Sequence, residues 1–339
     1  MTTSSQSPFE FVPYEALGES PNIIVDGAPN DFTVLTLSHW PKSGTPIELK
    51  RDTSAEIAFA YLDTPTFHRN VDVISNNHFD EDGLVGLFTL LDPQLAQKNR
   101  ELLIEVGTAG DFCTYANRAA ARVVFVLSAF ADPTVSPLAA GIFQDSYAGM
   151  TAQLYQELLP ALPDILERLN EYRKYWEAED AHLSRSEAYL ENGTIEIEER
   201  ADVDLAIVRI PDDLPSERAH RFTNPVSAAC HPFAICNRTT CNRLVLVQGQ
   251  CLEMQYRYES WLQFVSRPIS GRVDLTGLCD QLNGQEKGAG RWVFDGVEQI
   301  DPKLHLQDAT NTSIDTESVI SKLCDHLGKG PVAWNPADD

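Results

Sequence analysis

Residues 71–91 constrain the fold of this chain more than any other stretch. An apolar, strand-like run comes first, the polar pattern His78-x-Asp80-x-Asp82 follows, and Gly83 opens an apolar, helix-like run. A strand that leads through a polar loop into a helix is the repeating unit of a parallel sheet. Because such sheets bind ligands at the carboxyl ends of their strands, this segment predicts an α/β fold with a functional site beside His78.

The side chains of His78, Asp80 and Asp82 are spaced two residues apart. In an extended chain, side chains at this spacing point to the same side, so one imidazole and two carboxylates are expected to face one point. Oxygen-rich ligand sets with one nitrogen suit Mn²⁺ or Mg²⁺, and suit Zn²⁺ or iron less well. In the alternative interpretation, Asp82 caps a helix, Asp80 forms a turn and His78 lies on the surface. The position between a strand and a helix favours the metal site.

Strands and helices alternate along the first part of the chain. Strand patterns at 22–26 and 32–38 and a helix pattern at 54–62 precede the segment around His78, and a helix rich in Ala and Val is predicted over 114–131. This alternation predicts a mainly parallel sheet.

The C-terminal part has a different pattern, with short alternating runs that predict the strands of a second, α+β domain. These runs lie at residues 194–198, 205–210, 233–236, 243–247 and 254–258. The predicted architecture is therefore α/β, with a mainly parallel sheet in the N-terminal domain, a helical linker and a smaller α+β C-terminal domain. The predicted parts are a disordered tail at 1–20, an α/β domain with the metal site at 21–140, a helical connection at 141–192, an α+β substrate-binding-like domain at 193–328 and a loose tail at 329–339.

Charge and hydropathy exclude several classes of partner. The chain has 339 residues and a formal net charge of −24, and no cluster of Lys and Arg offsets it, so binding to long nucleic acid is not expected. A small phosphorylated ligand is compatible with this charge, because bound metal ions would supply positive charge. The chain contains no run of about 18 apolar residues, so no membrane span is predicted. The N-terminus lacks a signal-peptide pattern, so a cytoplasmic location is expected, with a homodimer left open.

Three more side chains are candidate metal ligands because of their positions. Asp26 and His39 follow two predicted strands, and Asp111 precedes a predicted helix. Each also has an alternative, structural role, since Asp26 begins a turn and Asp111 and His39 cap neighbouring elements. Two residues of the C-terminal half are candidates for substrate binding: Arg257, from an alternating run, would reach an anion, and His231 would face a cleft unless it is a structural histidine.

The run His78-Phe-Asp80-Glu-Asp82-Gly83-Leu84 resembles the first motif of the DHH phosphoesterases. The Asp-His-His signature of that superfamily is absent, and Ser38-His39-Trp40-Pro41 stands before a helix that contains the similar Ala55-Glu56-Ile57. Asp26 resembles the aspartate of the second motif, and Gly110-Asp111-Phe112 resembles the fourth-motif region. Because the motifs follow a different order here, the resemblance implies a circularly permuted sheet.

The resemblance implies a centre with one or two Mn²⁺ or Mg²⁺ ions that clamp a phosphate and activate a water for in-line attack. One ion would be held by His78, Asp80 and Asp26, and the other by Asp82, His39, Asp111 and a bridging Asp26. Ser266-Arg267 and the glycine-rich loop at 284–290 resemble the C-terminal domain that accompanies DHH domains. They imply phosphate contacts from Arg267, Lys287 and Arg291, although the loop lacks the superfamily's histidine.

Two functions are left open. The first is a metal-dependent phosphoesterase that acts on a small phosphorylated or nucleotide-like molecule. The alternative is a non-catalytic binding or interaction protein descended from the same fold, since Ser38 and Trp40 replace a carboxylate and an imidazole. A hydrolase acting on other substrates through one metal ranks below both. The whole chain also resembles an uncharacterised bacterial family of unknown function, through runs such as Leu37–Pro41, Asn77–Gly83 and Arg291–Gly296.

Overall fold

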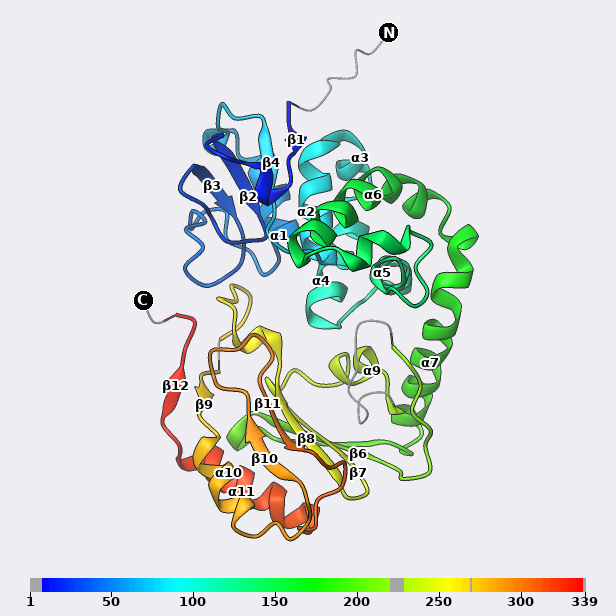
Figure 1. The fold of residues 1–339 in the computed structure, drawn as a ribbon, viewed down its shortest axis with the longest axis vertical. Coiled ribbons are helices and arrows are strands. Elements are labelled where there is room, and N and C mark those ends of the chain that lie inside the picture. Colours follow the sequence, from blue (N-terminus) through cyan, green and yellow to red (C-terminus); the bar gives the residue numbers. More distant parts are fainter. Residues whose placement is uncertain (1–7, 220–228, 269, 338–339) are drawn as a thin grey trace. The chain divides into compact units, whose positions relative to one another are not determined.

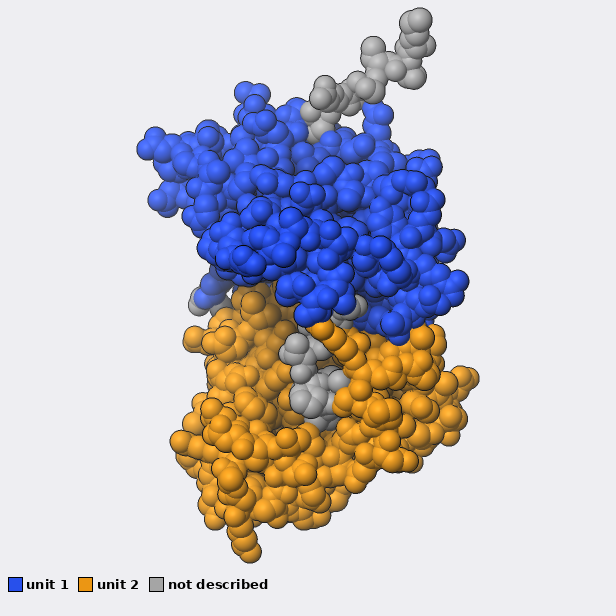
Figure 2. All heavy atoms as spheres, turned by 45° about the vertical axis from the view of Figure 1, so that its right-hand side comes forward, with its two compact units in different colours: residues 1–180, 263–267 blue, residues 181–262, 268–339 orange. Residues whose placement is uncertain are grey.

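The computed structural model describes residues 8–219, 229–268 and 270–337. The chain divides into two compact units, coloured separately in Figure 2: unit 1 is Met1–Asp180 with Gln263–Arg267, and unit 2 is Ala181–Leu262 with Pro268–Asp339. The segment predicted as a helical connection is shared between them. Helix α6 (Tyr147–Glu167) packs against other helices of unit 1, whereas α7 (Arg173–Glu191) begins in unit 1 and ends in unit 2.

Unit 1 contains a four-stranded sheet in the order β1-β4-β2-β3, and all of its paired strands are parallel (Figure 1). The strands are β1 (Glu10–Phe11), β2 (Asn22–Val25), β3 (Thr33–Leu37) and β4 (Val73–Ser75). The parallel sheet predicted from the alternating pattern is confirmed. Strand β1 lies within the predicted tail at 1–20, because Glu10 N and Val12 N donate to the carbonyls of Asp72 and Ile74. Of that tail, residues 1–7 lie outside the described residues.

The helices α2 to α6 lie together beside this sheet in Figure 1. Besides α6, unit 1 contains α1 (Ser54–Asp63), α2 (Glu81–Leu91), α3 (Pro93–Lys98), α4 (Arg100–Phe112) and α5 (Arg118–Ala131). Helix α1 begins with a capping box, in which Thr53 and Glu56 each accept a hydrogen bond from the other's backbone N–H. The apolar residues of α2 are buried against α1 and α4, which fixes the loop before α2 at the edge of the sheet.

Unit 2 contains a six-stranded sheet in the order β10-β11-β8-β7-β6-β5, in which only the β6–β7 pairing is parallel among the described residues. Its strands are β5 (Glu196–Arg200), β6 (Leu205–Ile210), β7 (Arg243–Gln248), β8 (Cys251–Tyr256), β10 (Arg291–Phe294) and β11 (Lys303–Gln307). Its described helices include α9 (Pro232–Cys236), α10 (Thr276–Asn283) and α11 (Thr316–Lys329). Their apolar faces meet the sheet in one core that includes Trp292 and Leu323.

Two predictions for the C-terminal half differ from the structure. The run at 233–236 forms α9 and not a strand, because Pro232 suits a first helical turn and His231 caps it by accepting from Phe233 N. The tail predicted from 329 contains β12 (Val332–Trp334), which pairs with β9 (Arg272–Val273), while residues 338–339 lie outside the described residues. No described helix is long and apolar enough to cross a membrane.

Candidate metal centre

Three neighbouring strands place polar side chains at one edge of the parallel sheet. Asp26 follows β2 directly, His39 follows the end of β3, and His78 lies in the loop between β4 and α2. Because β2 pairs in parallel with both β3 and β4, their carboxyl ends are adjacent. Ligand sites are common at this edge of α/β sheets.

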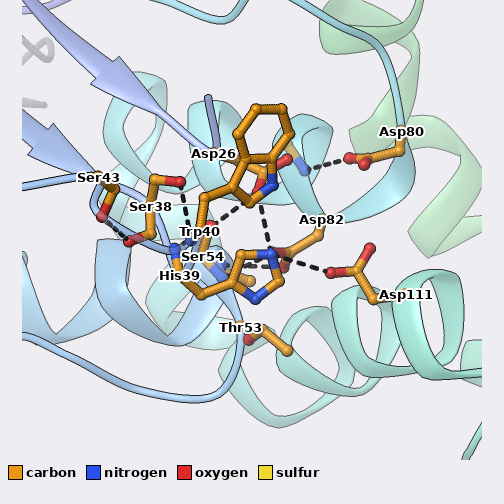
Figure 3. Close-up of polar contacts among 12 residues, drawn as sticks. Asp26, Ser38, His39, Trp40, Ser43, Thr53, Ser54, Asp80, Asp82 and Asp111 are labelled. Atoms are coloured by element: carbon orange, nitrogen blue, oxygen red, sulfur yellow. Dashed lines mark hydrogen bonds and ion pairs between the residues drawn. The ribbon is translucent and has the colours of Figure 1, made fainter. Parts of the chain in front are cut away.

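Asp26 is the centre of a network of side-chain contacts (Figure 3). Its Oδ1 lies 3.4 Å from His39 Nε2, and its Oδ2 lies 3.3 Å from His78 Nε2. Asp80 Oδ2 lies 2.9 Å from the same nitrogen of His78, and Asp111 Oδ2 lies 3.4 Å from the same nitrogen of His39. The two oxygens of Asp26 therefore face two different groups, each with one imidazole and at least one further carboxylate.

Asp82 completes the group on the His39 side. Ligand atoms of Asp26, His39 and Asp82 lie within 4.8 Å of one another, and so do those of Asp26, His78 and Asp80. The six predicted metal ligands are thus brought together in two groups that share Asp26, with Asp111 next to His39. Whether they bind an ion stays a prediction.

The geometric reason given for the triplet from His78 to Asp82 is wrong, because the chain there is not extended. Strand β4 ends at Ser75 and α2 begins at Glu81, so Asp82 lies in the first turn of a helix. Asp80 is the N-cap of α2 and accepts from Gly83 N at 2.8 Å. The cap that the alternative interpretation assigned to Asp82 is therefore formed by Asp80, and the helical turn sends Asp82 to the His39 side.

Asp111 also differs from its expected position. It lies in the last turn of α4 and does not open a helix, because Cys113, with φ +56°, ends α4 in a left-handed conformation. Figure 3 shows its carboxylate pointing toward the His39 ring. The candidate ligands thus combine side chains that follow strands with side chains from the ends of α2 and α4.

The first turn of α1 orients two of the carboxylates. Ser54 Oγ donates to Asp26 Oδ1 at 2.7 Å. The backbone N–H groups of Ser54 and Ala55 donate to Asp82 Oδ2 and Oδ1 at 2.6 and 2.9 Å. The N-terminus of a helix favours negative charge, so these contacts orient both carboxylates and favour their charged form.

His39 is oriented by a backbone carbonyl. Its Nδ1 lies 2.7 Å from the carbonyl oxygen of Asp52. Since a carbonyl only accepts hydrogen bonds, Nδ1 carries a proton, and Nε2 is the ring nitrogen that faces Asp26 and Asp111 and is placed to bind an ion. Metal-binding histidines are commonly oriented in this way.

His78 is held by stacking. The Trp40 ring lies 4.9 Å from the His78 ring, with 30° between their planes. His78 Nε2 faces two carboxylates, whereas its buried Nδ1 has no hydrogen-bond partner in the part of the chain that the structure describes. Trp40, which replaces a histidine in the DHH comparison, therefore fixes the orientation of a candidate ligand.

The site concentrates negative charge in a buried place. Relative exposures are 1% for Asp26, 0% for Asp82 and 4% for His39. Burial, followed by the charge of Asp80, raises the pKa of Asp26, and burial together with Asp26 and Asp80 raises the pKa of Asp82 well above its ordinary value. Burial alone would lower the pKa of His78, but the Asp80 and Asp26 carboxylates raise it well above its ordinary value. A divalent cation would relieve this repulsion.

The backbone accommodates the crowded carboxylates through a left-handed conformation at Asp26 and through glycines at positions 83 and 107. Asp26 has a φ of +53°, which non-glycine residues adopt rarely and mostly at functional sites or turns. A Cβ on Gly83 would lie 2.6 Å from Tyr155 Oη and 3.0 Å from Asp26 Oδ2, and a Cβ on Gly107 would lie 2.4 Å from Asp82 Oδ1. Glycine is therefore required where the surrounding helices approach the carboxylates.

The five predicted substrate-binding residues divide between the units. Arg267 belongs to unit 1, where its guanidinium lies 4.7 Å from the centre of the Phe264 ring. Lys287 and Arg291 are exposed residues of unit 2. Arg257 and His231 are buried in unit 2, where Arg257 pairs with Glu259 and His231 caps α9. These last two have structural partners of their own, and their contact with a substrate stays a prediction.

Sequence reasoning missed the residues that orient the ligands. Ser54 directly follows the N-cap of α1, and Asp52 directly precedes it. Their contacts with Asp26 and His39 join residues 28 and 13 positions apart. A Ser directly after a helix cap could indicate a hydrogen bond to a strand-end carboxylate. The sequence does not show which carboxylate, because that depends on how α1 packs against the sheet.

Comparison with known proteins places the chain in a family without supplying an activity. No curated protein and no solved structure matches it. The match to the family gives no support to the resemblance to DHH phosphoesterases, which stays an interpretation of short motifs. A family of unknown function, DUF6687, matches residues 7–338, so the chain belongs to that family.

Proposed function

We propose that unit 1 carries a metal-dependent phosphoesterase centre that binds Mn²⁺ or Mg²⁺ and acts on a small phosphorylated or nucleotide-like substrate. The observation that carries the proposal is the position of Asp26, whose Oδ1 and Oδ2 face His39 and His78 separately. A carboxylate that faces two ligand groups in this way suits a bridging ligand between two cations. The mixture of imidazole nitrogen and carboxylate oxygen suits Mn²⁺ in particular.

Bound cations at such a centre neutralise phosphate charge and lower the pKa of an attacking water. The protein's own residues supply the rest. Asp52 and Trp40 orient the two imidazoles, and Ser54 holds the shared carboxylate of Asp26. No side chain has to form a bond to the substrate. The net charge of −24 favours a small substrate over long DNA or RNA.

A non-catalytic binding protein is the second candidate, and one observation favours it. Both oxygens of Asp82 already accept backbone N–H groups from α1. This suits a structural role for Asp82 and would leave the group around His39 with fewer oxygens for an ion. A protein that binds one ion near His78 and hydrolyses nothing would fit this alternative.

The test combines metal stoichiometry with hydrolysis. Calorimetric titration of the purified protein with Mn²⁺ should reveal two ions, and a panel of phosphomonoesters and phosphodiesters should release phosphate or alcohol in their presence. Asp80→Asn should lose the ion near His78, because an amide is a poor ligand but still caps α2. Asp92→Asn is the matched control, since Asp92 caps α3 in the same way at a distance from the ligands.

Each outcome has a clear meaning. Two ions with phosphoester hydrolysis would support the proposal. One ion without hydrolysis would favour the binding protein. Failure of the wild-type protein to bind Mn²⁺ or Mg²⁺, or equal binding by wild type and Asp80→Asn, would overturn the metal centre.

A further inference from the structure

Residues 263–267 form a short segment, here called the strap, that belongs to unit 1 although the chain on both sides of it belongs to unit 2. The backbone N–H groups of Val265 and Ser266 donate to Asp52 Oδ1 at 2.7 and 3.0 Å. Lys50 Nζ donates to Gln263 Oε1 at 2.5 Å. The side chain of Asp52 is therefore the main polar anchor of the strap.

Asp52 contacts the candidate metal centre through its other end. Its carbonyl oxygen accepts the hydrogen bond from His39 Nδ1 that directs Nε2 toward Asp26. One residue thus binds the strap with its carboxylate and a candidate metal ligand with its backbone.

A second contact leads from the strap to the same group. The ring of Phe264 lies 5.0 Å from the ring of Phe112, which directly follows Asp111 in α4. The Phe112 ring in turn lies 6.3 Å from the His39 ring. The strap therefore contacts Phe112, which follows Asp111 in α4 and lies close to the His39 ring.

We propose that Asp52 is a positioning residue, which fixes His39 for metal binding only while its carboxylate holds the strap. The inference rests on the proposed metal centre. Two hydrogen bonds from the strap fix the Asp52 side chain, and with it the orientation of the peptide carbonyl that accepts from His39. Because coupling between two binding events is reciprocal, an ion bound at His39 also stabilises the docked strap.

Two substitutions separate positioning from charge. Asp52→Ala removes the acceptor for Val265 and Ser266 but keeps the carbonyl to His39, and α1 keeps its own cap, Thr53. Asp52→Asn removes the same negative charge but keeps an oxygen that accepts both N–H groups. If Asp52 acts by position, Asp52→Ala should weaken the affinity of the ion at His39 by about 10-fold, the lower end of the loss for residues that orient metal ligands, and Asp52→Asn should bind nearly as wild type does. The affinity of the ion at His78 should not change in either variant.

A second measurement follows the strap itself. Hydrogen–deuterium exchange in the peptide that covers 263–267 should slow when Mn²⁺ is added to the wild type and to Asp52→Asn, and should be fast with and without Mn²⁺ in Asp52→Ala. A merely structural Asp52 would not make strap exchange depend on the metal.

The outcomes separate the two proposals. Absence of Mn²⁺ binding by the wild type would overturn the metal centre and this inference together. Binding of Mn²⁺ with equal affinity by wild type and Asp52→Ala would overturn the inference alone, and so would strap exchange that ignores the metal. Equal weakening in Asp52→Ala and Asp52→Asn would also overturn it, because that result indicates a simple charge effect.

Discussion

Both units bury charged side chains, but they treat the charge differently. In unit 2, Arg272 is fully buried, and its guanidinium donates to Ser260 Oγ and to the carbonyl oxygens of Val297, Gln299 and Ile300. In unit 1, the buried carboxylates of the candidate metal centre face one another and two imidazoles. A buried charge is costly unless partners satisfy it. The guanidinium is satisfied by four hydrogen-bond acceptors. The carboxylates of unit 1 accept hydrogen bonds from Ser54 and Ala55, but they also repel one another.

The pKa values follow the same division. Burial lowers the pKa of Arg272 to about 10, which leaves the side chain charged at neutral pH. In unit 1, burial and neighbouring carboxylates raise the pKa values of Asp26 and Asp82. Strongly shifted carboxylates at a sheet edge are typical of functional sites, while a buried and fully bonded arginine is not. The comparison teaches that the partners of a buried charge are more informative than the burial itself.

The largest effect is expected from removing the buried, hydrogen-bonded guanidinium of Arg272. Arg272→Met should lower the free energy of unfolding by about 3 kcal/mol, because Ser260 and three carbonyl groups lose a charged donor at about 1–3 kcal/mol for each bond that water cannot replace. Chemical denaturation would measure it. Arg209→Met is a suitable control, since Arg209 forms an ion pair with the exposed Glu317 that should contribute less than about 1 kcal/mol. Equal stability of Arg272→Met and wild type would break the comparison, because the arginine would then not be structural.

The next effect is expected at the candidate metal centre of unit 1, where a substitution should change the affinity for metal and not the stability of the fold. Asp26→Asn should weaken Mn²⁺ binding by at least about 100-fold, the upper end of the loss for residues that only orient ligands. Asparagine tolerates the left-handed backbone of residue 26, so the fold should survive. Without metal, the variant should be as stable as wild type or more stable, since a repelling charge is removed.

The control for this substitution is Asp308→Asn, which makes the same change at another Asp with positive φ, at an exposed position. It should leave Mn²⁺ binding unchanged in calorimetry. A large loss of stability in metal-free Asp26→Asn would contradict the comparison, because the carboxylate would then be a satisfied structural group like Arg272.

Part of the centre could be predicted from the sequence because it depends on sheet geometry. Asp26, His39 and His78 each follow an apolar run, and parallel strands bring such positions to one edge. The side taken by Asp82 could not be predicted, since it depends on whether α2 begins at residue 81 or a few positions later. The position of Asp111 depends in the same way on where α4 ends. Helix boundaries of this kind are the least certain feature of any sequence pattern.

The residues that form hydrogen bonds or ion pairs with the buried charged groups were harder to predict from the sequence. The roles of Ser54 and Asp52 arise only when α1 packs against the sheet, because their partners are distant in sequence. Arg257 was a candidate for anion binding in an alternating run, yet its partner is Glu259, two residues away and equally buried. An arginine beside a polar run has the same local pattern whether it meets a substrate or a carboxylate of its own chain, so pattern alone cannot separate the two.

The smallest effect concerns a neutral buried group in unit 2. His182 is 2% exposed, and its ring meets that of His231 edge to face at 5.3 Å. Burial, and then the neighbouring His231, lower the pKa of His182 to about 4. In the unfolded chain, His182 is protonated as the pH falls through about 6.5, whereas in the folded chain it is protonated only near pH 4. Stability from this group is therefore fully present above pH 6.5 and is lost as the pH falls toward 4.

Between pH 6.5 and pH 5, this one group should cost the folded protein up to about 1.5 kcal/mol, because the unfolded histidine is already half protonated at pH 6.5 and the slope approaches 1.36 kcal/mol per pH unit only below that. His182→Phe fills a similar space and does not titrate. Its free energy of unfolding should therefore fall by that much less than the wild-type value between the two pH values, as measured by chemical denaturation. His326→Gln provides the control, because His326 is close to the surface, where it bonds the carbonyl of Asp274, and should keep the wild-type slope. A slope in His182→Phe as steep as in the wild type would mean that unit 2 accepts a buried charge without a full set of hydrogen-bond partners, and the contrast with the fully bonded Arg272 would weaken.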